Sequence, residues 1–106
     1  MRKTIYENIN ALPFYQHNHF LDFLKSKFSD YEVIGSSTTF GGTEVNPKVF
    51  NNLFILLQER GISISYYYRI MDGEKKEVLA NVRIELIGED EKIGEVEKII
   101  KESENS

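Results

Sequence analysis

The 106-residue sequence predicts an α+β fold: a three-stranded mixed or antiparallel sheet in a β-α-β-β-α core, with two helices before it and the helices mainly on one face. Apolar residues recur with helical spacing over 19–29 and over 91–102. In 62–70 and 78–86, a bulky apolar side chain instead occupies every second position, as in a strand with one buried face. The alternating segments predict the strands of the sheet, and the segments with helical spacing predict the helices that pack on it.

Two helices are expected ahead of the first strand. Thr4 and Glu7 have the spacing of a capping box, so the segment 1–14 is expected to hold a short helix that Pro13 ends. The second helix, over 19–29, carries a stripe of large apolar side chains: Phe20, Leu21, Phe23, Leu24 and Phe28. Such a stripe indicates a helix that packs firmly against a sheet.

The first strand is expected from Tyr31 to Phe40. Its alternation is interrupted by Gly35, Ser36 and Ser37, which favours a bent or edge strand. The pair Gly41-Gly42 is expected to end it. With a right-handed crossover to the next strand, the spatial order of the three strands is expected to be 1-3-2, with 3-2-1 as the alternative.

A helix is also expected over 46–60, because its ends carry clear local signals. Asn46 is a favoured N-cap, and Pro47 suits the first helical position because its missing N–H would be unpaired there anyway. Gly61 supplies a left-handed stop. The expected buried face is broad: Val49, Phe50, Leu53, Phe54, Leu56 and Leu57.

The two alternating segments are expected to form a hairpin through the turn at Asp72-Gly73. Both even-numbered faces must point the same way, so paired residue numbers must sum to an even number. A loop of 73–75 satisfies this rule and pairs Ile70 with Val78, Tyr68 with Ala80, Tyr66 with Val82, and Ile64 with Ile84. After the amphipathic helix at 91–102, a frayed tail is expected at 103–106.

Charge is distributed unevenly along the chain. The formal net charge is -4, from 13 basic and 17 acidic residues. Residues 88–106 contain seven of the acids and three of the bases, so residues 1–87 carry ten of each and are neutral. Without a basic surplus to neutralise phosphates, nucleic-acid binding of the general electrostatic kind is not expected.

Composition excludes several further classes. The chain has no cysteine, which argues against thiol catalysis, disulfide frameworks and the usual structural zinc sites. No apolar run approaches the length of a membrane span, and no secretory signal is evident, so a cytoplasmic location is expected. The length is that of one domain, 1–106. No serine, histidine and acid grouping and no nucleophile elbow is present, so we expect neither an enzyme nor a cofactor.

His17 and His19 are the only histidines. On an extended chain, two imidazoles at i and i+2 lie on one side and can chelate a metal, whereas on a helix they diverge. The nearest acid is Asp22, and no further ligand has metal-site spacing. The sequence therefore favours surface histidines at a helix start, and no metal site is predicted.

The segment 35–43 suggests a small-ligand site as an alternative function. A strand, a loop rich in Gly, Ser and Thr, and a helix N-terminus at Asn46 would together suit a phosphate or nucleotide. The candidate ligand residues are Ser36, Thr38, Gly41, Gly42, Thr43, Asn46 and Lys48. Glu44 would repel an anion, and no established phosphate-loop motif is present.

The preferred function is a small non-catalytic protein-interaction module, regulatory or inhibitory. Tyr67 faces away from its tyrosine neighbours, between Arg69 and Arg83, and tyrosine and arginine are enriched at binding hot spots. Phe40 on the first strand is a further candidate contact. The expected partner is another protein, or a second copy in a homodimer, bound through the sheet face, a sheet edge or the acidic C-terminal helix.

Overall fold

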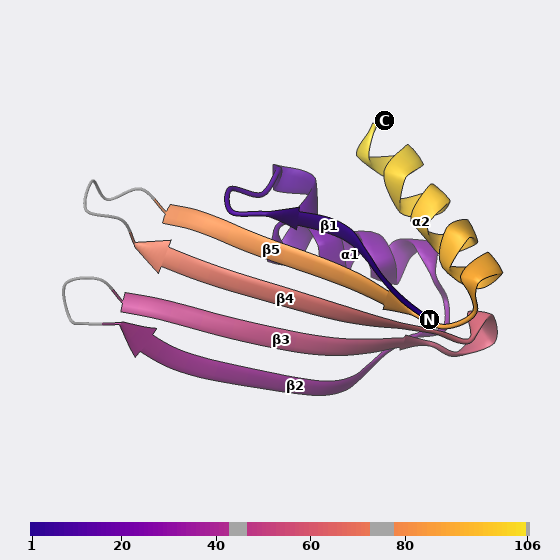
Figure 1. Cartoon of the computed structure of the whole chain (residues 1–106), viewed down its shortest axis with the longest axis horizontal. Helices are drawn as coiled ribbons and strands as arrows, with labels where there is room; N and C mark the ends of the chain where they lie inside the picture. Colours follow the sequence, from indigo (N-terminus) through magenta and orange to yellow (C-terminus); the bar gives the residue numbers. More distant parts are fainter. Residues whose placement is uncertain (43–46, 73–77, 106) are drawn as a thin grey trace.

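The computed structural model describes residues 1–42, 47–72 and 78–105, which form a five-stranded antiparallel sheet and two α-helices (Figure 1). The spatial strand order is β1-β5-β4-β3-β2. The elements in chain order are β1 (Arg2–Asn8), the short 3-10 helix η1 (Pro13–Tyr15), α1 (His17–Lys27), β2 (Tyr31–Gly42), β3 (Pro47–Leu57), the 3-10 helix η2 (Gln58–Arg60), β4 (Ile62–Asp72), β5 (Val78–Ile87) and α2 (Asp90–Glu104). The α+β class is as predicted, but the three-stranded sheet is wrong.

The expected N-terminal helix is instead the edge strand β1. It pairs antiparallel with β5, from Arg2 opposite Ile87 to Asn8 opposite Val82, with an irregularity between Thr4 and Tyr6. Ile5, inside that irregularity, is buried. A two-turn helix is marginal in water even with a cap. The sheet ladder and the burial of Ile5 are available only in the strand, so the tertiary contacts override the capping box.

The helix expected over 46–60 is also wrong, because 47–57 is strand β3. β3 pairs with β2 from Gly42 opposite Pro47 to Tyr31 opposite Leu57, and with β4 on its other side. A short apolar run such as 53–57 fits either a buried helix or a strand. Gly61 does adopt a left-handed φ of 66°, but it ends η2 rather than a long helix. The three expected strands lie in the alternative order, 3-2-1, with β3 inserted between β4 and β2, so the preferred order 1-3-2 is wrong and no crossover is needed.

The remaining elements follow the sequence prediction closely. α1, β2, β4, β5 and α2 are present, and β2 is an edge strand as expected. The β4–β5 register differs by two residues, however: Tyr66 lies opposite Ile84 and Tyr68 opposite Val82. The even-sum rule still holds, and Ile64, Tyr66, Val82 and Ile84 face the core as expected. Neither helix is long and apolar enough to cross a membrane, among the residues described.

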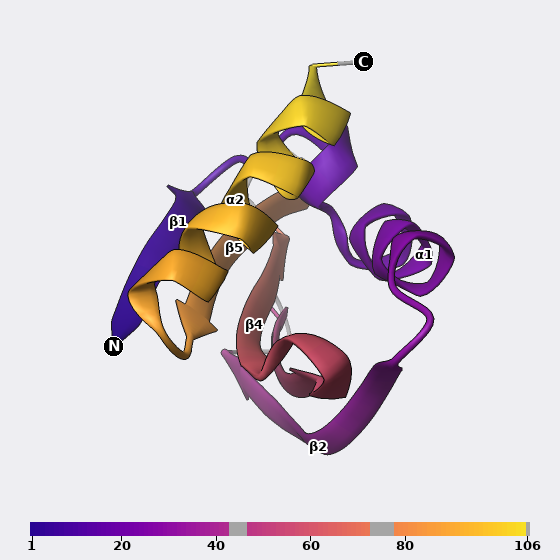
Figure 2. The same cartoon turned by 90° about the vertical axis from the view of Figure 1, so that its right-hand side faces the viewer.

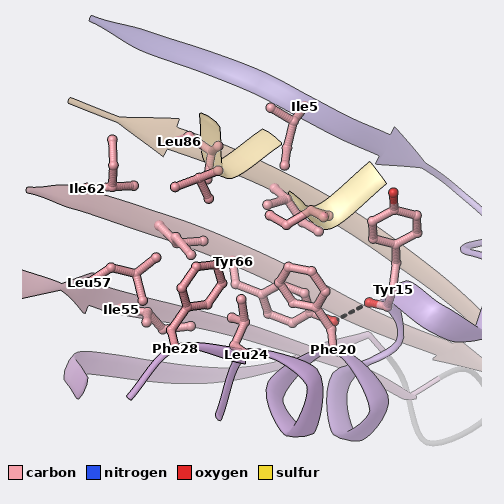
Figure 3. Packing of buried hydrophobic residues seen from close by; sticks show 14 of the residues in the cluster. Ile5, Tyr15, Phe20, Leu24, Phe28, Ile55, Leu57, Ile62, Tyr66 and Leu86 are labelled. Carbon is pink, nitrogen blue, oxygen red and sulfur yellow. Dashed lines mark hydrogen bonds between the residues drawn. The ribbon is translucent and has the colours of Figure 1, made fainter. Parts of the chain in front are cut away.

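Both helices pack on the same, concave face of the sheet (Figure 2). The core between them is continuous and apolar, and Figure 3 shows most of it. Its members are Ile5, Ala11, Tyr15, Phe20, Leu24, Phe28, Ile55, Leu57, Ile62, Ile64, Tyr66, Val82, Ile84, Leu86, Ile93, Val96 and Ile100. Tyr66 stacks on Phe20, with ring centroids 5.3 Å apart, and its hydroxyl donates to the Tyr15 carbonyl oxygen at 2.6 Å. This one side chain therefore ties β4 to both α1 and η1.

Two buried phenols should make the fold sensitive to alkali. Burial raises the pKa of Tyr66 well above its ordinary value, and burial together with the hydrogen bond to Glu104 does the same for Tyr15. Below about pH 10 the folded and the unfolded chain both keep the two phenol protons. Above that pH the unfolded chain loses them first, so the free energy of unfolding falls as the pH rises. The free energy of unfolding in urea, measured between about pH 9 and pH 11, should therefore decline. Tyr66→Phe should show a shallower decline, and an equally steep one would contradict this origin.

Candidate functional site

The face of the sheet opposite the helices is uncovered by any described element (Figure 2). On β4 the side chains of Ile62, Ile64 and Tyr66 enter the core, so the odd-numbered ones between and after them lie on this second face. The strand registers extend it to both neighbours. We define the open face by Phe50, Asn52, Phe54 and Leu56 of β3, Ser63, Ser65, Tyr67 and Arg69 of β4, and Asn81, Arg83, Glu85 and Ile87 of β5.

Two arginine–aromatic pairs lie side by side on the open face. Arg83 is directly opposite Tyr67, and its guanidinium carbon lies 5.3 Å from the tyrosine ring centroid. Arg69 is directly opposite Phe50, with a corresponding distance of 5.8 Å. Each such contact is worth roughly 0.5–1 kcal/mol at an exposed site. Together they hold two planar cations and two aromatic rings in fixed positions across three strands.

The two arginines differ in charge compensation. The Nε of Arg83 lies 3.5 Å from one carboxylate oxygen of Glu85, whose other oxygen lies 3.3 Å from the Nε of Arg2. Within 1–42, 47–72 and 78–105, Arg69 has no ion pair, and its buried Nε has no hydrogen-bond acceptor. An unsatisfied buried donor costs about 1–3 kcal/mol. Arg69 is therefore the cation on this face with most to gain from an added acceptor.

Two glycines of β2 extend the apolar part of the open face. A Cβ added at Gly35 would lie 3.5 Å from the Phe54 ring, and one at Gly41 would lie 3.2 Å from the Phe50 ring. Both phenylalanines thus lean over glycines towards the sheet edge. Phe54 remains 45% exposed. These glycines therefore make room for aromatic rings, a use familiar from edge strands.

The predicted protein-contact residues do not all meet. Tyr67, Arg69 and Arg83 share the open face, as described above. Phe40 lies on the opposite, helix-bearing face of β2, in register with Val49 of β3. The sheet there extends past the helices (Figure 1), and Phe40 is 77% exposed. Phe40 is therefore separate from the tyrosine–arginine group and belongs to the edge strand.

The residues suggested for a phosphate site are not brought to a helix N-terminus. The expected helix after Asn46 is absent, because β3 begins at Pro47. Ser36, Thr38, Gly41 and Gly42 belong to β2, Lys48 belongs to β3, and Thr43 and Asn46 lie outside the described residues. The Thr38 hydroxyl donates to the Asn51 side-chain oxygen at 2.9 Å. Without the helix dipole, the physical basis of that hypothesis is lost.

Both histidines lie on α1, where two positions at i and i+2 diverge. The Nδ1 of His17 is 3.1 Å from the Asn18 side-chain oxygen, and its ring lies 5.6 Å from that of Tyr68. No group of three His, Asp or Glu side chains suited to a metal occurs in the part of the chain that the structure describes. His17 therefore packs at the start of α1 beside the sheet.

Phe50 and Phe54 are the site residues that the sequence prediction missed. Both were assigned to the buried face of a helix that does not form. Leu53, Ile55 and Leu57 alternate with period two, and this alternation is the signal that would have placed Phe54 on the other face. No protein-family model, curated protein or solved structure matches this chain. The function is therefore inferred from the site alone.

Proposed function

We propose that this chain is a small, non-catalytic protein-interaction module of the cytoplasm, regulatory or inhibitory in role, that binds another protein through the open face. The observation that carries the proposal is the pair of adjacent arginine–aromatic contacts on a sheet face without cover. Tyrosine and arginine dominate binding hot spots because they combine a large contact area with directional hydrogen bonds. The partner is held in place by the rigid ladder of β3, β4 and β5 beneath.

The chemistry of the open face indicates the kind of partner. Arg69 has no ion pair among the described residues, so a carboxylate of the partner would pair with its guanidinium. Phe54 and the ring of Phe50 supply an apolar surface beside it. A protein segment that carries a carboxylate next to apolar side chains would match this arrangement.

The acidic helix α2 is a weaker candidate for the same role. Lys3 forms an ion pair with Glu97 at 2.7 Å, and the Tyr15 hydroxyl donates to Glu104. Lys101 lies 3.9 Å from Glu104 and adds a second contact. Two of the seven carboxylates of residues 88–106 are thus engaged within the fold, whereas Arg69 on the open face has no ion pair among the described residues. This contrast favours the open face.

Replacing Tyr67 with alanine should strongly weaken partner binding while the fold persists. The tagged full-length chain, its Tyr67→Ala variant and a matched Arg60→Ala variant would be used to capture proteins, quantified by mass spectrometry. Arg60 stacks on Phe28, 5.2 Å from its ring centroid, and lies away from the open face. A hot-spot side chain is worth at least about 2 kcal/mol, so captured partners should fall more than about tenfold with Tyr67→Ala.

The control separates binding from folding. Arg60→Ala loses a comparable cation–aromatic contact and should keep the captured partners, and circular dichroism should show that both variants are folded. If every protein captured by the unaltered chain is recovered equally with folded Tyr67→Ala, the open face is not the binding surface.

A further inference from the structure

The two edges of the sheet differ in how they are protected. Natural edge strands are kept from pairing with other strands by charge, shortness, proline or bulges. β1 is seven residues long, carries Arg2, Lys3 and Glu7, and is irregular near its centre. β2 is twelve residues long and has neither charge nor proline from Val33 to Gly42. From Gly35 to Gly42 its pairing with β3 is uninterrupted, so the outer edge of this segment is a regular strand.

β2 carries three exposed large apolar side chains and is otherwise rich in glycine, serine and threonine. Val33, Ile34 and Phe40 are 44%, 54% and 77% exposed. A long edge strand without charged side chains offers its unpaired backbone groups to another strand. β1 offers no such surface, since its described side chains other than Ile5 and Tyr6 are polar or charged. The unsatisfied edge is therefore β2.

We propose that β2 pairs antiparallel with β2 of a second copy of this chain, joining two five-stranded sheets across a two-fold axis at Thr38. We place the axis at Thr38 because this residue is midway between Gly35 and Gly41, in the part of β2 whose pairing with β3 is uninterrupted. In this register Gly35 lies opposite the partner's Gly41. The hydrogen bonds of this pairing lie along the strand edge, and of the open-face side chains only Phe50 and Phe54 come near it. An experiment can therefore contradict this proposal without contradicting the function proposed above.

The glycines make this register favourable on the open face. The Phe54 ring leans over Gly35, and the Phe50 ring leans over Gly41. With Gly35 opposite the partner's Gly41, Phe54 and the partner's Phe50 approach each other across the junction of the two β2 strands. The two glycines between the rings have no side chain to separate them. The two-fold repeats this contact, so two pairs of aromatic rings would close over the junction.

The excess negative charge of the chain lies far from the proposed contact between the two copies. The excess of acid lies in residues 88–106, and α2 packs against β5, the fourth strand from the free edge of β2. Strands are spaced about 4.8 Å apart, so seven spacings would separate the two β5 strands by roughly 33 Å, several times the screening length of about 8 Å at physiological salt. The only acid of β2 is Glu32, which lies at its end. The net charge of -4 therefore opposes pairing only weakly.

Single-cysteine variants test both the contact and its register. The chain has no native cysteine, so each introduced thiol reports on its own position. Thr38→Cys should form a disulfide-linked dimer on oxidation, because directly opposed strand residues have Cα atoms about 4.5–5.5 Å apart. Ser36→Cys should not link to itself, but it should link to Phe40→Cys when the two variants are mixed. Thr4→Cys, on the other edge strand, should form no disulfide-linked dimer under the same conditions.

A matched pair of lysine variants tests the association without crosslinking. The unaltered chain and Thr4→Lys should sediment with twice the chain mass, whereas Thr38→Lys, which sets two lysines opposite each other, should weaken dimerisation at least about tenfold. Circular dichroism should show that Thr38→Lys is folded. Tyr67→Ala should remain dimeric, so loss of the open-face function would not affect this result.

The proposal fails if the unaltered chain sediments as a monomer at all concentrations tested, or if folded Thr38→Lys dimerises as strongly as the unaltered chain. Preferential crosslinking of Thr4→Cys would assign the contact to the other edge and would also overturn it. Self-linking of Ser36→Cys in place of Thr38→Cys would overturn the register.

Discussion

Replacing Tyr66 with alanine should lower the free energy of unfolding by about 3–5 kcal/mol, the range for removing a large aromatic side chain from a core. Tyr66 is fully buried and stacks on Phe20, so its loss opens a cavity between β4 and α1. It also deprives the Tyr15 carbonyl oxygen of its 2.6 Å hydrogen bond. Urea denaturation followed by circular dichroism measures the change. A domain of this size has only about 5–15 kcal/mol in total, so the effect should be plain.

Two further variants separate the parts of this effect. Tyr66→Phe keeps the ring and removes the donor, so it should lower stability by about 1–3 kcal/mol. Tyr67→Ala, at the next position but on the opposite face of the sheet, should change stability by less than about 1 kcal/mol. If Tyr66→Ala and Tyr67→Ala destabilise equally, the assignment of Tyr66 to the core is wrong.

Replacing Gly88 with alanine should lower the free energy of unfolding by about 2 kcal/mol or more. Gly88 joins β5 to α2 with a φ of 156°, which side-chain-bearing residues rarely adopt. An added Cβ would lie 2.6 Å from Cδ1 of Ile62 and 3.0 Å from the Gly61 carbonyl oxygen. The Ile62 side chain can rotate, but the Gly61 carbonyl belongs to the backbone. Relief of the clash would also disturb the two backbone hydrogen bonds between Gly88 and Met1.

Gly94 supplies the matched comparison. It lies within α2, is exposed, and an added Cβ would meet nothing within 4 Å. Gly94→Ala should therefore raise stability by about 0.5–1 kcal/mol through helix propensity and the loss of freedom in the unfolded chain. Thermal and urea unfolding of both variants should give shifts of opposite sign. Shifts of the same sign would show that one of the two environments is misassigned.

The open face could be predicted only in part from the sequence, and the residues that the prediction missed were missed for one reason. Tyr67, Arg69 and Arg83 were assigned to one face because strict alternation in 62–70 and 78–86 fixes the side on which each residue lies. Phe50 and Phe54 complete that face, but they could be placed there only once 47–57 was known to be a strand. The signals at Asn46 and Pro47 favoured a helix, and each is worth only about 1 kcal/mol. Pairing with two neighbouring strands outweighs them.

Four elements could be predicted from their long and unambiguous hydrophobic period, namely α1, α2, β4 and β5, and the concentration of acid in residues 88–106 could be read directly. By contrast, β1, β3, the strand order and the two-residue shift in the hairpin register depend on contacts between distant segments. The physical reason is the range of the interactions. Periodicity and caps act between near neighbours, whereas β1 owes its conformation to β5, about eighty residues away. A short segment with mixed local preferences takes the form that its distant partners stabilise most.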